Sequence, residues 1–123
     1  MSNESKNKPY DLEQRTFLFA QEVIGLVHAL PRNIPNDEVG RQVVQSAGSV
    51  GANYIEANEA LSRKDFLMRI KICRKEAKES AYWLKLVQCR SEAETTRAGL
   101  VQEATELMKI FNAIIEKSKK VSA

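Results

Sequence analysis

The sequence contains few of the residues on which metal sites and disulfide-rich folds depend. Its 123 residues include two cysteines, one histidine and three prolines, and only 7% are aromatic. Low glycine, proline and aromatic content disfavours a many-turned β-sandwich. The single histidine, His28, excludes a ferritin-like di-iron bundle, which needs two Glu-x-x-His motifs, and no Cys-x-x-Cys pair is present for zinc. Cys73 and Cys89 lie roughly 24 Å apart if one helix carries both, too far for a disulfide.

Signals for catalysis, export and membrane insertion are missing as well. The chain has neither a nucleophile elbow nor a Walker motif. Residues 1–9 are polar and do not resemble a signal peptide, and the most apolar segment, residues 17–30, is shorter than a membrane helix. We therefore expect a cytoplasmic protein with no membrane association, no enzymatic activity, no cofactor and no metal.

Helical periodicity covers most of the chain. It predicts helices over residues 11–30, 36–60, 63–89 and 96–118, with N-caps at Asp11, Asn36, Ser62 and either Thr95 or Thr96. The clearest heptad pattern consists of Phe66, Ile70, Cys73, Ala77, Ser80, Leu84 and Val87. Short connections between long helices predict an all-α fold, an antiparallel up-down-up-down four-helix bundle. This single domain spans residues 10–120 and follows a disordered tail over residues 1–9.

The helix over residues 36–60 has two seams. One consists of apolar side chains, Val43, Ala47, Val50, Tyr54, Ala57 and Leu61. The other contains small residues and consists of Val44, Gly48, Gly51, Ile55 and Asn58. We interpret the glycines as sites of close helix approach, since no Gly-Lys-Ser/Thr follows them to form a phosphate loop. Near its end, Glu56 and Glu59 are placed to pair with Arg69 or Arg74 of the next helix.

Basic charge is concentrated in the helix over residues 63–89. Residues 62–90 contain nine basic and three acidic residues, a net charge of +6, whereas the whole chain carries +3. On a helical wheel most of these cations share one side with Tyr82; they are Lys64, Lys71, Arg74, Lys75, Lys78 and Lys85. Cations spread along about 30 Å could follow a phosphate backbone, with Tyr82 stacking on a base. The alternative is a solvated surface that only keeps the bundle soluble.

A further stripe of the same helix combines apolar residues with two glutamates. It contains Met68, Ile72, Glu76, Glu79, Trp83 and Leu86. An exposed tryptophan beside aliphatic residues is typical of a contact surface. The helix over residues 11–30 is apolar on more than one side. We therefore predict self-association through Ile72, Trp83, Leu86, Phe19 and Val23, with Trp83 at the edge of the intramolecular core as the alternative.

Several segments together resemble a known bacterial family. They are Tyr10-Asp11-Leu12-Glu13, Gln45-Ser46-Ala47-Gly48-Ser49-Val50-Gly51-Ala52-Asn53-Tyr54-Ile55-Glu56-Ala57, Ser62-Arg63-Lys64-Asp65-Phe66, Arg69-Ile70-Lys71-Ile72-Cys73-Arg74-Lys75-Glu76-Ala77-Lys78-Glu79-Ser80 and Tyr82-Trp83-Leu84. They resemble the four-helix-bundle proteins encoded by intervening sequences in 23S ribosomal RNA genes. That family is distantly similar to the accessory variability determinant of diversity-generating retroelements.

This resemblance implies an antiparallel bundle that assembles as a ring-like homopentamer. It also implies contact with nucleic acid, because the distant relative binds nucleic acid and a reverse transcriptase. Carried over to this chain, the nucleic-acid-binding residues are the six cations of the basic stripe. Our hypothesis is a homo-oligomeric RNA- or DNA-binding accessory protein, and the alternative is a protein-interaction scaffold with no nucleic-acid role.

Overall fold

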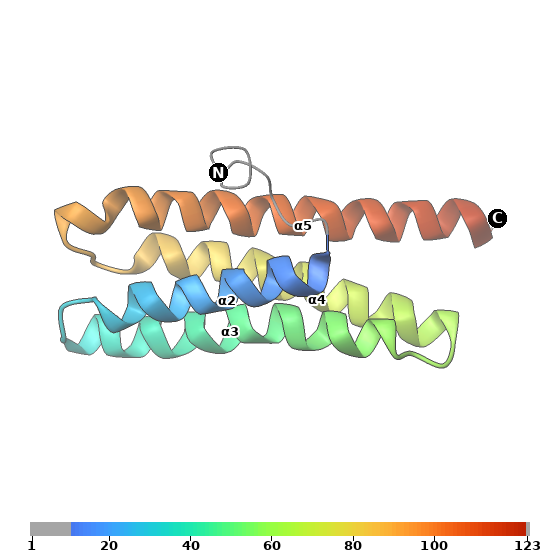
Figure 1. Cartoon of the computed structure of the whole chain (residues 1–123), viewed down its shortest axis with the longest axis horizontal. Coiled ribbons are helices and arrows are strands. Elements are labelled where there is room, and N and C mark those ends of the chain that lie inside the picture. Colours follow the sequence, from blue (N-terminus) through green and yellow to red (C-terminus); the bar gives the residue numbers. More distant parts are fainter. Residues whose placement is uncertain (1–10, 123) are drawn as a thin grey trace.

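The computed structural model describes residues 11–122 as four long antiparallel helices (Figure 1). They are α2 (Leu12–His28), α3 (Ile34–Asn58), α4 (Arg63–Leu86) and α5 (Glu94–Ser122), with the short 3-10 helix η1 (Ser91–Ala93) preceding α5. Each helix packs on the next in sequence and α2 also packs on α5, so that α2 and α4 lie on a diagonal. The predicted all-α four-helix bundle is confirmed. The tail predicted over residues 1–9 lies outside the described residues.

The turn between α2 and α3 differs from the predicted one. The structure starts α3 at Ile34 and caps it with Asn33, whose side chain accepts a hydrogen bond from the Asn36 backbone N–H at 2.8 Å. The predicted cap, Asn36, is therefore wrong. Pro35 explains the shift, because a helix does not need the missing proline N–H in its first turn and can begin before the proline. Leu30 precedes Pro31 and lies outside α2, as expected of a residue before proline.

Helix α4 is capped at its start by Ser62 and satisfied at its end by a side chain of α5. Ser62 caps α4 as predicted and accepts from the Asp65 backbone N–H at 3.1 Å. However, α4 ends at Leu86 rather than near Cys89. The Arg97 guanidinium donates to the carbonyl oxygens of Leu84, Lys85 and Val87, and so satisfies the end of the helix from α5. Helix α5 starts at Glu94, before the predicted threonine caps.

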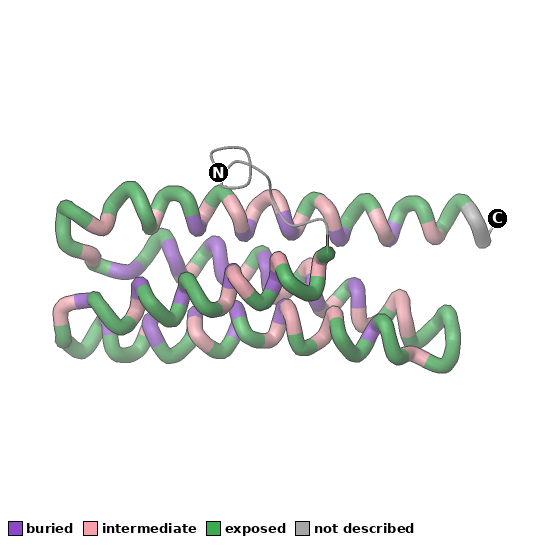
Figure 2. Tube along the Cα trace, viewed as in Figure 1, coloured by how far each residue is buried: buried purple, intermediate pink, exposed green. Residues whose placement is uncertain are grey.

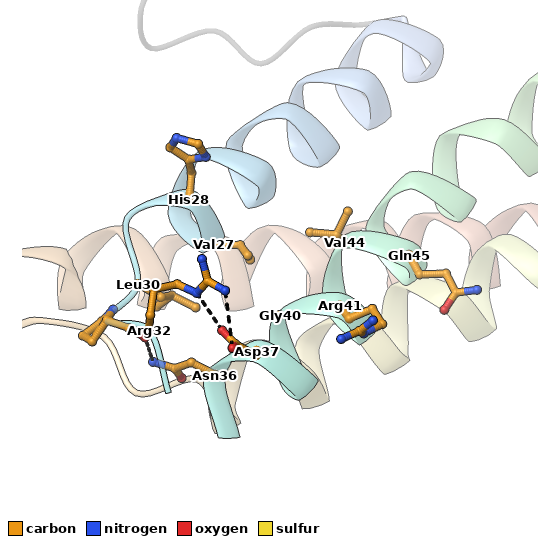
Figure 3. Close-up of a pocket in the computed structure, with 11 residues that line it drawn as sticks. Val27, His28, Leu30, Arg32, Asn36, Asp37, Gly40, Arg41, Val44 and Gln45 are labelled. Atoms are coloured by element: carbon orange, nitrogen blue, oxygen red, sulfur yellow. Dashed lines mark hydrogen bonds and ion pairs between the residues drawn. The ribbon is translucent and has the colours of Figure 1, made fainter. Parts of the chain in front are cut away.

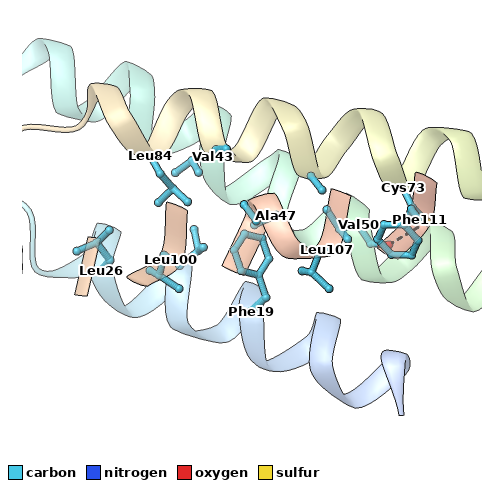
Figure 4. Close-up of a cluster of buried hydrophobic side chains, with 14 of the residues drawn as sticks. Phe19, Leu26, Val43, Ala47, Val50, Cys73, Leu84, Leu100, Leu107 and Phe111 are labelled. Carbon is cyan, nitrogen blue, oxygen red and sulfur yellow. Dashed lines mark hydrogen bonds between the residues drawn. The ribbon is translucent and has the colours of Figure 1, made fainter. Parts of the chain in front are cut away.

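The core runs along the bundle axis and follows the predicted seams (Figures 2 and 4). Ile70, Cys73, Ala77, Ser80, Leu84 and Val87 are all buried, as the heptad pattern of α4 indicated. From α5, Leu100, Ala104, Leu107, Phe111 and Ile115 are buried against them. Leu61, predicted to extend the α3 seam, is instead fully exposed because α3 ends at Asn58. Ser46 and Ser80, the buried hydroxyls of α3 and α4, bond to each other at 2.8 Å.

The glycines of α3 have different surroundings. A Cβ atom on Gly51 would lie 3.1 Å from Thr16 Oγ1, and one on Gly40 would lie 3.0 Å from Val27 Cγ1. These two glycines let α2 approach α3 closely. A Cβ atom on Gly48 would meet nothing within 4 Å. The predicted role in helix approach is therefore confirmed for Gly51, while nothing within the bundle requires glycine at position 48.

Candidate nucleic-acid interface

Four lysines form a line on the outward side of α4. Lys64, Lys71, Lys78 and Lys85 recur every seven residues, about 10.5 Å apart along the helix, and all four are exposed. Among the described residues, none of the four lies within ion-pair distance of a carboxylate. Lys75 is also exposed and lies 3.9 Å from a Glu79 carboxylate oxygen. Five of the six predicted cations therefore present ammonium groups to solvent over about 32 Å.

The sixth predicted cation, Arg74, has a structural contact. It is half-buried, and its guanidinium donates to Asn112 Oδ1 of α5 at 2.8 Å. In the register that this contact marks, Lys109, one turn before Asn112, is level with Lys78, one turn after Arg74. Lys109 is exposed and extends the basic surface onto α5. Sequence reasoning missed Lys109, because only the register between two helices places it beside α4.

Aromatic and acidic side chains border the lysine line. Tyr82 is exposed and meets Trp83 edge to face, with ring centroids 5.0 Å apart. Partial burial raises the pKa of the half-buried Glu76, and repulsion from Glu79 raises it further, whereas Lys75 lowers it.

The predicted pairing of Glu56 and Glu59 with the α4 arginines is wrong: Arg69 donates to Asn53 Oδ1 at 2.9 Å and Arg74 to Asn112.

The residues predicted for self-association fall into two groups. Leu86 is exposed, and Ile72 and Trp83 are half-buried, with Trp83 packed against the edge of the core. Phe19 and Val23 are 1% and 0% exposed and lie inside the bundle. Their assignment to an interface is wrong, because no second chain can reach them in the folded bundle. On α2 the neighbouring Phe17 and Ile24 are the exposed apolar residues, at 63% and 52%.

A second apolar surface lies on the outer side of α2 and α3. The exposed residues Phe17, Ile24 and Ile55 lie there with Gly48, and we call these four residues the α2/α3 face. At the turn between the two helices this side is hollowed by an open pocket of about 950 Å³ (Figure 3). Val27, Gly40 and Val44 line the pocket with polar residues of the turn. The cation Arg32 at its rim is already paired with Asp37 at 2.9 Å.

The described residues contain no group of three or more His, Cys, Asp and Glu side chains placed to hold a metal ion. Burial raises the pKa of the Cys73 thiol to about 12, and Cys73 Sγ donates to the Val50 carbonyl at 3.4 Å, so this thiol is not activated. His28, at the end of α2, is exposed. No helix in the described part of the chain is both long and apolar enough to cross a membrane.

Comparisons with known proteins agree with the fold. The sequence model of the family described as "23S rRNA-intervening sequence protein" matches residues 8–113. No curated protein matches the chain significantly. Among solved structures, the chain is similar to a protein of unknown function from the S23 ribosomal protein family of Bacteroides thetaiotaomicron. The two are 28% identical, the match covers 85% of this chain and 98% of that one, and the TM-score is 0.70.

Proposed function

We propose that this chain, which belongs to the 23S rRNA-intervening sequence protein family, binds structured RNA through the basic face of α4. The observation that carries the proposal is the line of Lys64, Lys71, Lys78 and Lys85, whose ammonium groups are exposed and have no carboxylate partner among the described residues. A rigid helix holds these charges at regular intervals, and Lys109 widens the line. Repeated single cations suit phosphates rather than base edges, so we expect binding that depends on backbone and shape.

We propose further that the protein acts in the cytoplasm, without enzymatic activity, as a homo-oligomer. The family resemblance favours a ring-like pentamer. Eight large hydrophobic residues are exposed on the described surface, and several of them share one side. Exposed apolar side chains that are scattered singly are normal on a monomer, whereas a group of them on one side favours a contact surface. Assembly would also bring several basic faces to one RNA, which raises avidity without new contacts.

A salt titration of affinity for an RNA hairpin tests RNA binding. The wild-type slope of log K against log salt should correspond to several phosphate contacts. Replacing Lys71, Lys78 and Lys85 together by alanine should reduce that slope by about 2–3, since each lost phosphate contact contributes a little under one.

The matched control replaces Lys117, Lys119 and Lys120 by alanine. This variant has the same net charge as the Lys71, Lys78 and Lys85 variant, but its changes lie at the end of α5. It should keep most of the wild-type slope. Equal loss in both triple variants would show that only net charge matters. Absence of binding at low salt would favour the alternative, a protein-interaction scaffold.

A further inference from the structure

Tyr82 is an exposed aromatic residue that lies within the lysine line of α4. Its side chain is 58% exposed, and its ring meets the ring of Trp83 with centroids 5.0 Å and planes 71° apart. The Tyr82 hydroxyl makes no hydrogen bond with any described residue. Tyrosine is less favourable in a helix than lysine, glutamate or alanine. Contacts among the described residues therefore do not explain an aromatic ring at this exposed position.

Trp83 supports the Tyr82 ring without covering it. Trp83 is half-buried and packs against the hydrophobic core, which fixes its own position. In an edge-to-face pair at most one face of the Tyr82 ring meets its neighbour, so the other face stays open. A flat group can stack on this open face. Because Trp83 already restricts the ring, stacking costs less side-chain entropy than it would on a free tyrosine.

Ammonium groups lie on both sides of the Tyr82 ring. Lys78 is four residues before Tyr82 and Lys85 is three residues after it, so both share its side of α4, about 6 Å and 4.5 Å away along the axis. Both lysines are exposed, and neither is within ion-pair distance of a carboxylate among the described residues. The half-buried Glu79 lies 3.9 Å from Lys75 Nζ. A nucleotide stacked on the ring would thus have a cation near the phosphate on each of its sides.

The geometry of RNA limits which bases can reach this ring. Bases inside a continuous duplex stack on one another, and the narrow major groove of A-form RNA excludes side chains. Unpaired bases in bulges and loops can turn outward and stack on aromatic residues. Among the described residues of α4, no other aromatic side chain is exposed. Lys64 and Lys71, towards the start of the helix, therefore offer charge alone, which suits the phosphates of a paired stem.

We infer that Tyr82 stacks on an unpaired base of the bound RNA, while Lys78 and Lys85 bind the phosphates beside that base. This inference deepens the RNA binding proposed above and rests on it. The other lysines of the line contact the paired stem. The preferred ligand is therefore an RNA duplex interrupted by an unpaired base, rather than a continuous duplex.

Three RNAs that differ at one position test the inference. They are a continuous duplex, the same duplex with one bulged adenosine, and the same duplex with a bulged abasic ribose, all with identical ends. The wild type should bind the adenosine bulge about tenfold more tightly than the other two, as expected for one base stacked on an aromatic ring. Tyr82→Leu should lose this preference, and Tyr82→Phe should retain it. Neither variant changes charge, so both should keep the wild-type salt slope.

Phe17→Leu is the matched control, because Phe17 is 63% exposed on α2, diagonally across the bundle from α4. It should keep the preference for the adenosine bulge. Equal wild-type affinity for the three RNAs, a preference that survives in Tyr82→Leu, or an equal loss in Phe17→Leu would overturn the inference and leave phosphate binding by the lysines intact. Failure of the wild type to bind any of the three RNAs at low salt would instead contradict the proposed RNA binding, and the inference with it.

A photochemical cross-link locates the unpaired base in the wild type and needs no variant. With 5-iodouridine at the bulge, ultraviolet light should join the base to Tyr82, and mass spectrometry of the peptides identifies the residue. A cross-link to another residue would overturn the inference. Light scattering compares the mass of each variant with the wild type. A lower mass for Tyr82→Leu with an unchanged RNA preference would assign the ring to protein contacts and overturn the inference as well.

Discussion

The inner and outer sides of α2 and α3 contain the same kinds of residue in different surroundings. Phe19 is buried and Phe17 exposed; Gly51 is in contact with Thr16 and Gly48 is open. On the inner side, contacts within the chain account for each residue. On the outer side they do not, although the residues are just as apolar or small. The comparison teaches that apolar content alone does not locate the core, and that the exposed apolar residues of the outer side are those that the proposed self-association would cover.

The pair Phe19 and Phe17 gives the largest expected difference. Phe19→Ala removes a ring that is 1% exposed and should lower the free energy of unfolding by about 3–5 kcal/mol. Phe17→Ala should change it by no more than about 0.5 kcal/mol when the chain is dilute and monomeric. Urea denaturation at two chain concentrations a hundredfold apart would measure both. Phe17→Ala should also weaken any dependence of stability on concentration, and a loss of dilute stability equal to that of Phe19→Ala would refute the distinction.

Asn36 and Asn33 form a second matched pair, at the turn between α2 and α3. The Asn36 amide donates to the carbonyls of Pro31 and Gln88, and its oxygen accepts from the Gln88 N–H. Asn36→Ala would remove all three of these partly buried hydrogen bonds and should cost about 2–3 kcal/mol. Asn33→Ala removes one exposed cap and should cost about 1 kcal/mol. Thermal denaturation of both variants checks the order; a larger loss for Asn33→Ala would contradict it.

The sequence predicts features that depend on residues close together in the chain, and it fails for features that depend on distant residues. The α4 seam from Ile70 to Val87 is predictable because its spacing is local and is the most regular heptad pattern in the chain. The prediction that Phe19 and Val23 lie at an interface is wrong because α2 is apolar on several sides, so periodicity alone does not identify the buried side. The cap at Asn33 was missed because both asparagines suit a cap, and Gln88, 52 residues away, is what engages Asn36.

For the candidate site too, prediction succeeds where one helix suffices and fails where two helices must be aligned. The exposed lysines of α4 were found from a helical wheel, since a wheel needs only one helix. The contact between Arg74 and Asn112, and with it the place of Lys109, depends on how α4 and α5 align. That alignment is set by the core and by Arg97 at the end of α4, which single-helix reasoning does not include.

Replacing Gly51 or Gly48 by alanine should change the free energy of unfolding in opposite directions. Gly51→Ala would force Thr16 to move, because the new Cβ atom would lie 3.1 Å from its hydroxyl oxygen, and should lower stability. Gly48→Ala meets no atom and should raise the stability of the dilute chain by about 0.5–1 kcal/mol through helix propensity. Urea denaturation distinguishes the two. A destabilised Gly48→Ala monomer would mean that the chain itself requires glycine there.

The two cysteines differ in how their ionisation is coupled to folding. The buried Cys73 thiol has its pKa raised to about 12, whereas its ordinary value is 9.0. As pH rises from about 9 to 12, the unfolded thiol ionises and the folded one does not. The free energy of unfolding should therefore fall over this range. Cys73→Ala should show a shallower fall, while Cys89→Ala, which changes a half-buried residue beyond the end of α4, should keep most of it. Denaturation at several pH values measures the slopes, and equal slopes in wild type and Cys73→Ala would show that other groups cause the fall.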